Sequence, residues 1–181
     1  LKKDCYTDGN IGAFDDFIME PIDMSALTSG SVQFNVAHQR YSTAYTDALE
    51  VLVSSDCGAT WVTVYSKSGA TLASVAGNNS NAFTPTATQW RADCADLSAF
   101  AGDSKVFVMF RAITGYGNNI YVDDINVSGV VCPTGINDVA ADNTNMQLFP
   151  NPANATANVS FELSSKEEVT LNIYNTLGEI V

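Results

Sequence analysis

The chain has 181 residues, of which 46% are hydrophobic, so it can bury a core and also form a smaller second unit. Its formal net charge of −12 excludes nucleic acid as an expected partner, because an acidic surface repels phosphate backbones and anionic membrane faces. No apolar run approaches the roughly 20 residues that cross a bilayer, so we expect no membrane insertion.

Alternating apolar residues predict strands through most of the chain, and no segment longer than a turn has a helical pattern. The predicted strands span residues 31–39, 48–54, 60–66, 104–112 and 118–127. The residues that share one face are Val32, Phe34 and Val36 in the first strand, Leu49, Val51 and Val53 in the second, and Val106, Val108 and Phe110 in the fourth. Strands separated by long polar loops indicate an all-β fold, a two-sheet sandwich of jelly-roll type.

The composition changes after the last of these strands. Residues 132–146 have little apolar periodicity and are typical of a linker, so we place a boundary near residue 138. The predicted organisation is a jelly-roll β-sandwich at 1–138, a linker at 139–146 and an incomplete second unit at 147–181. This last segment supplies about three strands, which are too few for an independent fold.

Four cysteines, Cys5, Cys57, Cys94 and Cys132, are widely spaced without a CxxC pair, and no zinc spacing surrounds them. Disulfides are the better interpretation, and they indicate an oxidising, extracytoplasmic location. Among the three possible connectivities we favour Cys57 with Cys94 and Cys5 with Cys132, because the second pair would tie the start of the sandwich to its end. The alternative is four buried thiols in a cytosolic protein.

Acidic residues near the first and last predicted strands suggest a metal site. Because Ile125 and Val127 fit core positions, a period of two places Asp123 toward the core and Asp124 outward. An inward carboxylate needs a partner, and structural Ca²⁺ accepts six to eight oxygen ligands. The candidate metal ligands are Asp123, Asp15, Asp16 and Glu20. In the alternative, Asp123 accepts backbone N–H groups or pairs with Arg111.

Aromatic residues in the predicted loops form a second candidate site. The candidate ligand-binding residues are Tyr41, Tyr45, Trp90 and Tyr116. Aromatic rings of this kind stack on sugar rings or on peptide partners. The sequence alone does not place them side by side, and Trp90 equally fits a core or rim position.

Signals for catalysis are weak. His38, the single histidine, lies in a predicted strand, and no serine or cysteine lies in a nucleophile turn such as GxSxG. We therefore expect no enzyme activity from this chain. Because it starts at Leu1 without a signal core, we expect further N-terminal sequence, and any catalytic domain would lie upstream of residue 1.

The tail carries a family resemblance. Leu148-Phe149-Pro150-Asn151-Pro152, followed by NVSFEL and VTLNIYNTLGEIV, resembles the start of the C-terminal sorting domain of type IX secretion substrates in the Bacteroidetes. The prolines fix two φ angles, and Gly178 suits a turn. The sorting-motif residues are Pro150, Asn151, Pro152 and Gly178. The resemblance implies the first strands of a small immunoglobulin-like β-sandwich that directs a folded periplasmic protein through the outer membrane.

The first unit resembles a second family. DDFIMEPIDMS, DALEVLVSSDCGATW, WRADCADLSAFAG, KVFVMFRA and GYGNNIYVDDINV follow the motif order of MAM-like jelly-roll modules on surface proteins of the same bacteria. The likeness covers roughly residues 10–128. It implies an accessory, non-catalytic module, and related modules often hold a structural ion where the candidate carboxylates lie.

Together these features predict a secreted or cell-surface protein, exported through the periplasm and outer membrane. The jelly-roll module would bind a surface glycan or a protein ligand, or serve adhesion. The tail would engage the type IX translocon and its outer-membrane shuttle protein. The alternative is an accessory domain of a secreted hydrolase, either a peptidase or a glycosidase, whose catalytic domain lies upstream.

Overall fold

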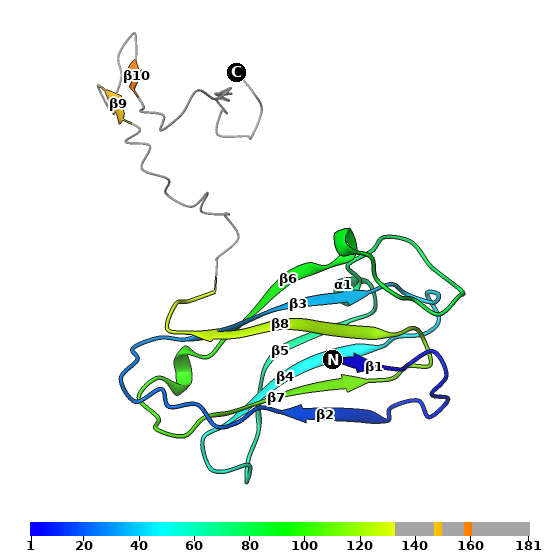
Figure 1. Cartoon of the computed structure of the whole chain (residues 1–181), viewed down its shortest axis with the longest axis horizontal. Coiled ribbons are helices and arrows are strands. Elements are labelled where there is room, and N and C mark those ends of the chain that lie inside the picture. The colour runs from blue at the N-terminus through cyan, green and yellow to red at the C-terminus, as the bar shows by residue number, and fades with distance from the viewer. Residues whose placement is uncertain (133–146, 150–157, 161–181) are drawn as a thin grey trace. The chain divides into compact units, whose positions relative to one another are not determined.

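The computed structural model describes residues 1–132, 147–149 and 158–160 (Figure 1). The chain divides into two compact units, Leu1–Pro133 and Thr134–Val181. In the second unit, β9 (Gln147–Phe149) and β10 (Asn158–Ser160) pair antiparallel. The predicted linker, the rest of the predicted second sandwich and the sorting-motif residues lie outside the described residues.

Two four-stranded antiparallel sheets form the first unit (Figure 1). One sheet has the order β1 (Lys2–Lys3), β8 (Ile120–Ser128), β3 (Ser31–His38) and β6 (Arg91–Asp96). The other has the order β2 (Phe14–Ile18), β7 (Phe107–Ile113), β4 (Ala48–Ser54) and β5 (Val62–Ser68). In the first unit the helical segments are single turns: α1 (Gly69–Leu72), η1 (Ala87–Gln89) and η2 (Ser98–Phe100). The prediction of an all-β sandwich is confirmed.

The core lies between the sheets and is built by the residues that the periodicity predicted. All nine residues predicted to share a face on three of the strands are buried, and none is more than 3% exposed. The ring of Phe34 packs edge-on against Tyr65 and Phe110, with centroids 5.2 and 5.0 Å apart, and so joins the two sheets. Burial of one such side chain stabilises a fold by about 1.5–3 kcal/mol.

Strand β6 was not predicted, because its inward side carries a charged residue. Asp93 is 9% exposed and accepts hydrogen bonds from the guanidinium of Arg91 at 2.9 and 2.8 Å and from the hydroxyl of Tyr65 at 2.6 Å. Lys67 lies 3.1 Å from the same carboxylate. Burial by itself would raise the pKa of Asp93, but the hydrogen bonds from Arg91, Tyr65 and Lys67 outweigh it and lower the pKa. A buried ionic network therefore takes the place of an apolar side chain at Asp93, whereas Ala95 of the same strand packs in the core.

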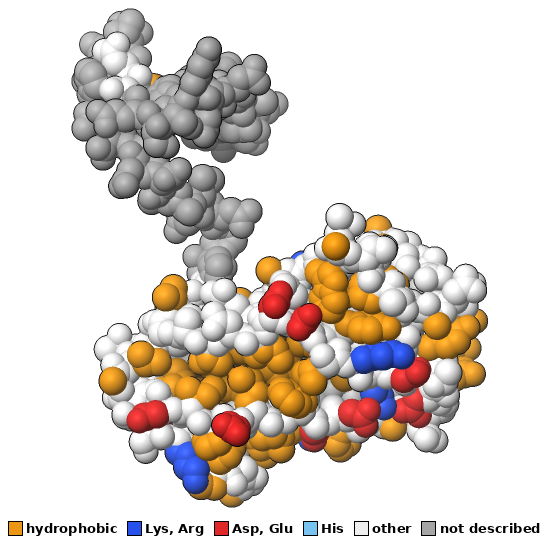
Figure 2. Space-filling view, in the orientation of Figure 1, with side chains coloured by type: hydrophobic (Ala, Val, Ile, Leu, Met, Phe, Trp, Pro, Cys, Tyr) orange, Lys and Arg blue, Asp and Glu red, His pale blue; other side chains and the backbone are white. Residues whose placement is uncertain are grey.

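One long side of the sandwich is open. Figure 2 shows hydrophobic side chains gathered between β8 and β2. A shallow cavity of about 90 Å³ there is lined by Phe17, Phe110 and Val122 among others. Strand β1 has only two residues, so it covers little of this edge. Strand β2 lies at the edge of the other sheet, beside β7, and every one of its residues is exposed, including Phe14 and Ile18 at 52% and 51%.

Helices in the described part of the chain are all too short to cross a membrane.

Candidate functional site

The buried carboxylate of Asp47 organises the loop between β7 and β8. Asp47 is 1% exposed and accepts the backbone N–H groups of Gly115, Gly117 and Asn118 at 2.8, 3.1 and 2.7 Å. A Cβ atom added to Gly115 would overlap the backbone of Thr46, and one added to Gly117 would overlap the Asp47 carboxylate. Only glycine permits this close approach. The segment 115–118, with the sequence GYGN, can therefore surround the Asp47 carboxylate.

Tyr116 stands between these two glycines and points outward. Its φ of 60° lies in the left-handed region, which is uncommon for a residue with a large side chain. The side chain is 44% exposed. The hydrogen bonds to Asp47 on both sides hold the backbone in this conformation, so the loop presents Tyr116 at a fixed place on the surface.

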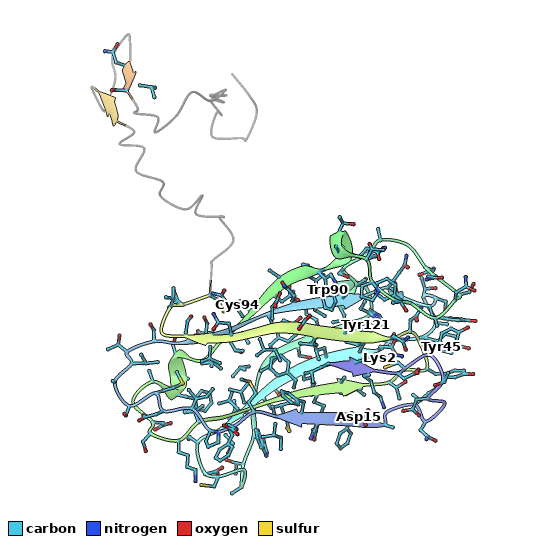
Figure 3. The ribbon with its side chains drawn as sticks, viewed as in Figure 1. Lys2, Asp15, Tyr45, Trp90, Cys94 and Tyr121 are labelled. Carbon is cyan, nitrogen blue, oxygen red and sulfur yellow. A yellow bond between two sulfur atoms is a disulfide. The ribbon has the colours of Figure 1, made fainter. Side chains whose placement is uncertain are left out.

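Tyr116 belongs to a row of four tyrosines at one end of the sandwich. Ring centroids lie 6.1 Å apart for Tyr6 and Tyr41, 5.6 Å for Tyr41 and Tyr45, and 5.6 Å for Tyr45 and Tyr116. Together with Gly117 these residues line a cavity of about 300 Å³, which we call the tyrosine cleft. Figure 3 shows Tyr45 among the loops at this end. Three loops therefore converge: the one after β1, the one between β3 and β4, and the one between β7 and β8.

The structure brings together three of the four aromatic residues that the sequence singled out. The fourth, Trp90, lies elsewhere, with its ring 6.4 Å from that of Tyr121 (Figure 3). Tyr6 completes the row instead. Tyr6 was not predicted, because it follows a two-residue strand that periodicity cannot reveal.

Two groups below the cleft could carry chemistry in another setting, but here both are buried. Cys5 is fully buried, and this burial raises its pKa to about 12, so its nucleophilic thiolate form is scarce at neutral pH. His38 is 1% exposed; its Nδ1 lies 3.1 Å from the carbonyl oxygen of Asn119 and its Nε2 lies 3.8 Å from Asp47. Both side chains support the loops that carry the tyrosines.

His38 gives the fold a pH dependence. Burial lowers its pKa, and this outweighs the Asn119 contact and the Asp47 charge, which act to raise it. In the unfolded chain the pKa is about 6.5, so below that pH the unfolded state binds more protons than the folded state. The contribution of neutral His38 to stability is therefore fully present above about pH 6.5. It is lost as the pH falls toward the lower pKa that His38 has in the folded state.

We expect His38→Gln to remove this part of the pH dependence. Urea midpoints of the wild type should fall between about pH 7.5 and about pH 5.5 by more than those of the variant. Comparing slopes rather than absolute stabilities allows for any constant cost of the substitution. Equal slopes in the two proteins would contradict the assignment to His38.

The prediction that Asp123 points into the core is wrong. Asp123 is exposed, and its carboxylate accepts only the N–H of Asp124 at 3.0 Å among the described residues. The reason is a bulge: the register between β3 and β8 shifts here, and Asp124 has a φ of 49°. The extra residue resets the alternation, so Val122 and Ile125 both pack toward the core although they are three residues apart.

The candidate metal ligands do not fit a calcium site. Asp16 forms a two-bond pair with Arg111, both at 2.8 Å, and Asp15 lies 3.1 Å from Lys3. Both carboxylates thus have a cationic partner, while Asp123 and Glu20 are exposed. Within the described ranges, no three His, Cys, Asp or Glu side chains converge as a metal site would require.

We therefore expect chelation to leave the sandwich unchanged. A melting curve of the full chain with EDTA should superimpose on the curve without it, because Asp15 and Asp16 pair with protein cations and the four candidate ligands do not converge. Addition of Ca²⁺ after dialysis should likewise cause no shift. A fall in the melting temperature with EDTA that Ca²⁺ reverses would restore the calcium hypothesis.

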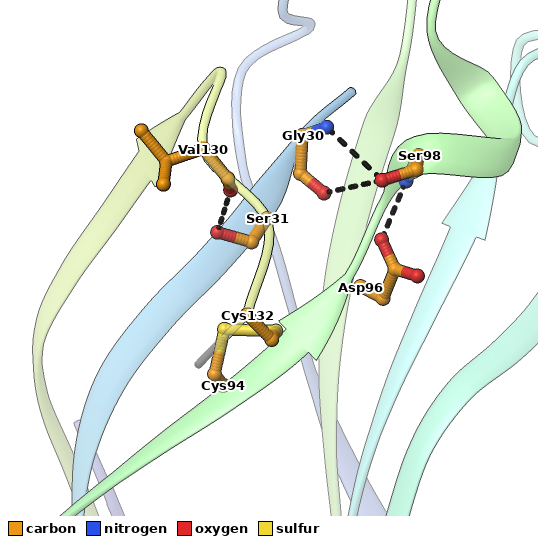
Figure 4. The surroundings of a disulfide bond; sticks show 7 residues. All are labelled: Gly30, Ser31, Cys94, Asp96, Ser98, Val130 and Cys132. Carbon is orange, nitrogen blue, oxygen red and sulfur yellow. Dashed lines mark hydrogen bonds between the residues drawn. A yellow bond between two sulfur atoms is a disulfide. The ribbon is translucent and has the colours of Figure 1, made fainter. Parts of the chain in front are cut away.

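The cysteine pairing also differs from both predicted pairs. Cys94 and Cys132 form a disulfide with Cα atoms 5.7 Å apart (Figure 4). Cys5 and Cys57 are free, the first buried and the second in the exposed turn between β4 and β5. The segment after β8 folds back across β3, and the hydroxyl of Ser31 donates to the carbonyl of Val130 at 2.6 Å.

The path of the segment after β8 explains why Cys132 bonds to Cys94. On β3, Gln33 pairs with Cys94 on one side and with Asn126 of β8 on the other, so a chain leaving β8 and crossing β3 arrives at β6. The disulfide thus fastens the end of the sandwich rather than joining its two termini. The spacing of the cysteines in the sequence does not show that the chain after β8 crosses β3 and reaches β6.

Comparison with known families identifies the tail. Residues 147–181 match the secretion system C-terminal sorting domain, which confirms the resemblance to type IX secretion substrates. A comparison with curated proteins finds no match.

Solved structures with a similar arrangement include two domains of one protein. They are the K1 and K3 cleaved adhesin domains of Lys-gingipain from Porphyromonas gingivalis W83, each 18% identical. The TM-scores are 0.47 and 0.49; the matches cover 70% of this chain in both cases, and 72% and 71% of the respective domains.

Proposed function

Because residues 147–181 belong to the secretion system C-terminal sorting domains, which carry proteins across the outer membrane, we propose that the sandwich is a non-catalytic binding module displayed outside the cell. Its binding site is the tyrosine cleft, and its ligand is a glycan or a peptide segment of a surface partner. The sorting domain implies engagement with the type IX secretion machinery. Contact with the translocon and its outer-membrane shuttle protein is part of the proposal.

The observation that carries the proposal is the row of four tyrosines around one cavity. A tyrosine ring offers an apolar face for stacking and a hydroxyl for hydrogen bonds, at a low cost in side-chain entropy. Within the described residues, the hydroxyls of Tyr41, Tyr45 and Tyr116 donate to no protein group, so they are free to bond a ligand. Fixed rings around a small cavity favour recognition of one sugar ring or one side chain at a time.

The support below the cleft strengthens this interpretation. Asp47 and its three backbone donors fix the Tyr116 loop before any ligand arrives. A preorganised site loses less entropy on binding than a mobile one does. The left-handed backbone at Tyr116 is a local cost that the fold bears for an exposed side chain. Costs of this kind are characteristic of functional sites.

The test is binding of the labelled full chain to an array of glycans and surface peptides. We expect Tyr45→Ala and Tyr116→Ala to weaken binding by about tenfold each, which corresponds to the loss of roughly 1.4 kcal/mol of ring contact. Trp90→Ala is the matched control, since it removes an aromatic residue of the same chain that lies outside the cleft. Circular dichroism of each variant confirms that the sheets are intact.

Two results would contradict the proposal. One is binding that both tyrosine variants retain and the Trp90 variant loses. The other is turnover of a bound ligand by the chain, which would replace a binding role with a catalytic one.

A further inference from the structure

Arg40 is set apart from the other arginines of the chain. Arg91 and Arg111 each use their Nε to bond a carboxylate, at 2.9 Å to Asp93 and at 2.8 Å to Asp16. Arg40 forms no ion pair within the described residues, and its Nε is a buried donor without a protein acceptor among them. In a chain with 20 acidic and 8 basic residues, an arginine that avoids every carboxylate is unusual. A buried unpaired donor costs about 1–3 kcal/mol unless something else satisfies it.

Arg40 lines an open cavity of about 420 Å³. The rest of the wall is formed by Ala70 and residues 73–78, none of which is acidic. The segment is anchored at Arg40 itself, whose carbonyl accepts the N–H of Asn79 at 2.8 Å. Among the residues that line the cavity, Arg40 is therefore the one cation, and none is acidic.

The cavity and the tyrosine cleft share one loop. Arg40 directly precedes Tyr41, and Thr46 directly follows Tyr45. A Cβ atom placed on Gly69 would lie 4.0 Å from Arg40 Nε and 3.4 Å from the Thr46 side chain, so both side chains lie against the same glycine. The segment between β3 and β4 therefore contributes to both cavities.

We propose that the Arg40 cavity binds a carboxylate group, and that the ligand of this end of the sandwich is acidic. A guanidinium presents a planar fork of N–H donors that matches a carboxylate, and the bond is stronger where water is partly excluded. The carboxylate belongs to an acidic sugar or to an acidic side chain of a peptide, which share this chemistry. The inference rests on the proposed function only in assigning the carboxylate to the ligand of the tyrosine cleft.

The first experiment titrates the full chain with acetate and follows the Nε–Hε signals of its three arginines by NMR. The expected result is a saturable shift of the Arg40 signal, with the Arg91 and Arg111 signals unmoved because their Nε groups already bond carboxylates. Acetamide, which has the same size and no charge, should move none of them. No shift at Arg40, or equal shifts of all three signals, would overturn the proposal.

The second experiment separates the two sources of the carboxylate. Trigalacturonate and a triaspartate peptide are compared on the wild type and on Arg40→Gln, with Arg111→Gln as the control for loss of one positive charge. Arg40→Gln should weaken binding of the preferred probe by about tenfold, and Arg111→Gln should leave it unchanged. If the two variants weakened binding equally, the loss would be due to the change in net charge and not to the Arg40 cavity, and the proposal would be overturned.

The outcomes also separate this inference from the proposed function. If the tyrosine variants lose array binding while acetate leaves Arg40 unmoved, only the carboxylate site fails. If acetate moves Arg40 while the tyrosine variants bind normally, the carboxylate site stands and the tyrosine cleft does not.

Discussion

Replacing Asp47 by alanine is expected to destabilise the sandwich by about 3–5 kcal/mol, because the substitution leaves buried N–H groups without an acceptor. The three donors belong to Gly115, Gly117 and Asn118, which are all buried, so solvent does not take the place of the carboxylate while the loop keeps its position. Urea unfolding followed by tryptophan fluorescence measures the loss. Ligand binding should fall as well, since the same bonds fix Tyr116.

Two comparisons make this result specific. Asp47→Asn keeps one acceptor oxygen and the same shape, so its loss should be smaller than that of the alanine variant. Asp56 accepts the N–H and the hydroxyl of Thr60 at 2.9 and 2.6 Å, and these bonds lower its pKa to about 2, but it lies in an exposed turn. Asp56→Ala should therefore cost much less. Equal losses for Asp47→Ala and Asp56→Ala would contradict the role of burial.

The second large effect is expected from the disulfide. Changing both Cys94 and Cys132 to serine opens a loop with a sequence separation of 38 residues. In the loop-entropy account this lowers the free energy of unfolding by about 4 kcal/mol. The measurement is urea unfolding of the double variant beside the oxidised wild type. Dithiothreitol should give the wild type the stability of the double variant.

Cys57→Ser provides the control and also tests the correction to the pairing. Cys57 is exposed and free, so its replacement should leave the urea midpoint unchanged. A loss comparable to that of the double variant would point back to a bond between Cys57 and Cys94. The disulfide and the sorting domain are consistent with each other, because a cystine persists in the periplasm and outside the cell.

Five strands and the main core follow from the sequence because their chemistry is simple. In β3, β4 and β7 each inward position is apolar, so a period of two identifies the buried face without knowledge of the neighbours. The tail was recognised for another reason: a proline-clamped segment followed by two apolar runs is a distinctive motif, and the family match covers the same residues.

Features that depend on pairing between distant segments could not be predicted in the same way. The bulge at Asp124 reverses the face of Asp123, and only the register against β3 reveals it. Strand β6 buries Asp93 because Tyr65, Arg91 and Lys67 reach it from other positions. An alternation rule assumes regular strands and apolar interiors, and these two sites violate one assumption each.

In the candidate site, too, some features follow from the local sequence and others depend on how distant segments meet. The sequence supplied the residue type, aromatic side chains in loops, and it supplied Tyr41, Tyr45 and Tyr116. It could not show that Trp90 lies apart or that Tyr6 joins the row, since both depend on how the loops fold. It also gave no sign that Asp47 anchors the Tyr116 loop, because the carboxylate and its donors are about 70 residues apart in the chain.

Hydroxyl-radical footprinting of the full chain, with and without a partner selected on the array, tests the central claim most directly. The account predicts that the partner protects Tyr41, Tyr45 and Tyr116 from oxidation, while Trp90 and the exposed Phe14 react as before. Protection of Trp90 or of Phe14, with the three tyrosines left reactive, would place the binding surface elsewhere on the sandwich and contradict the account.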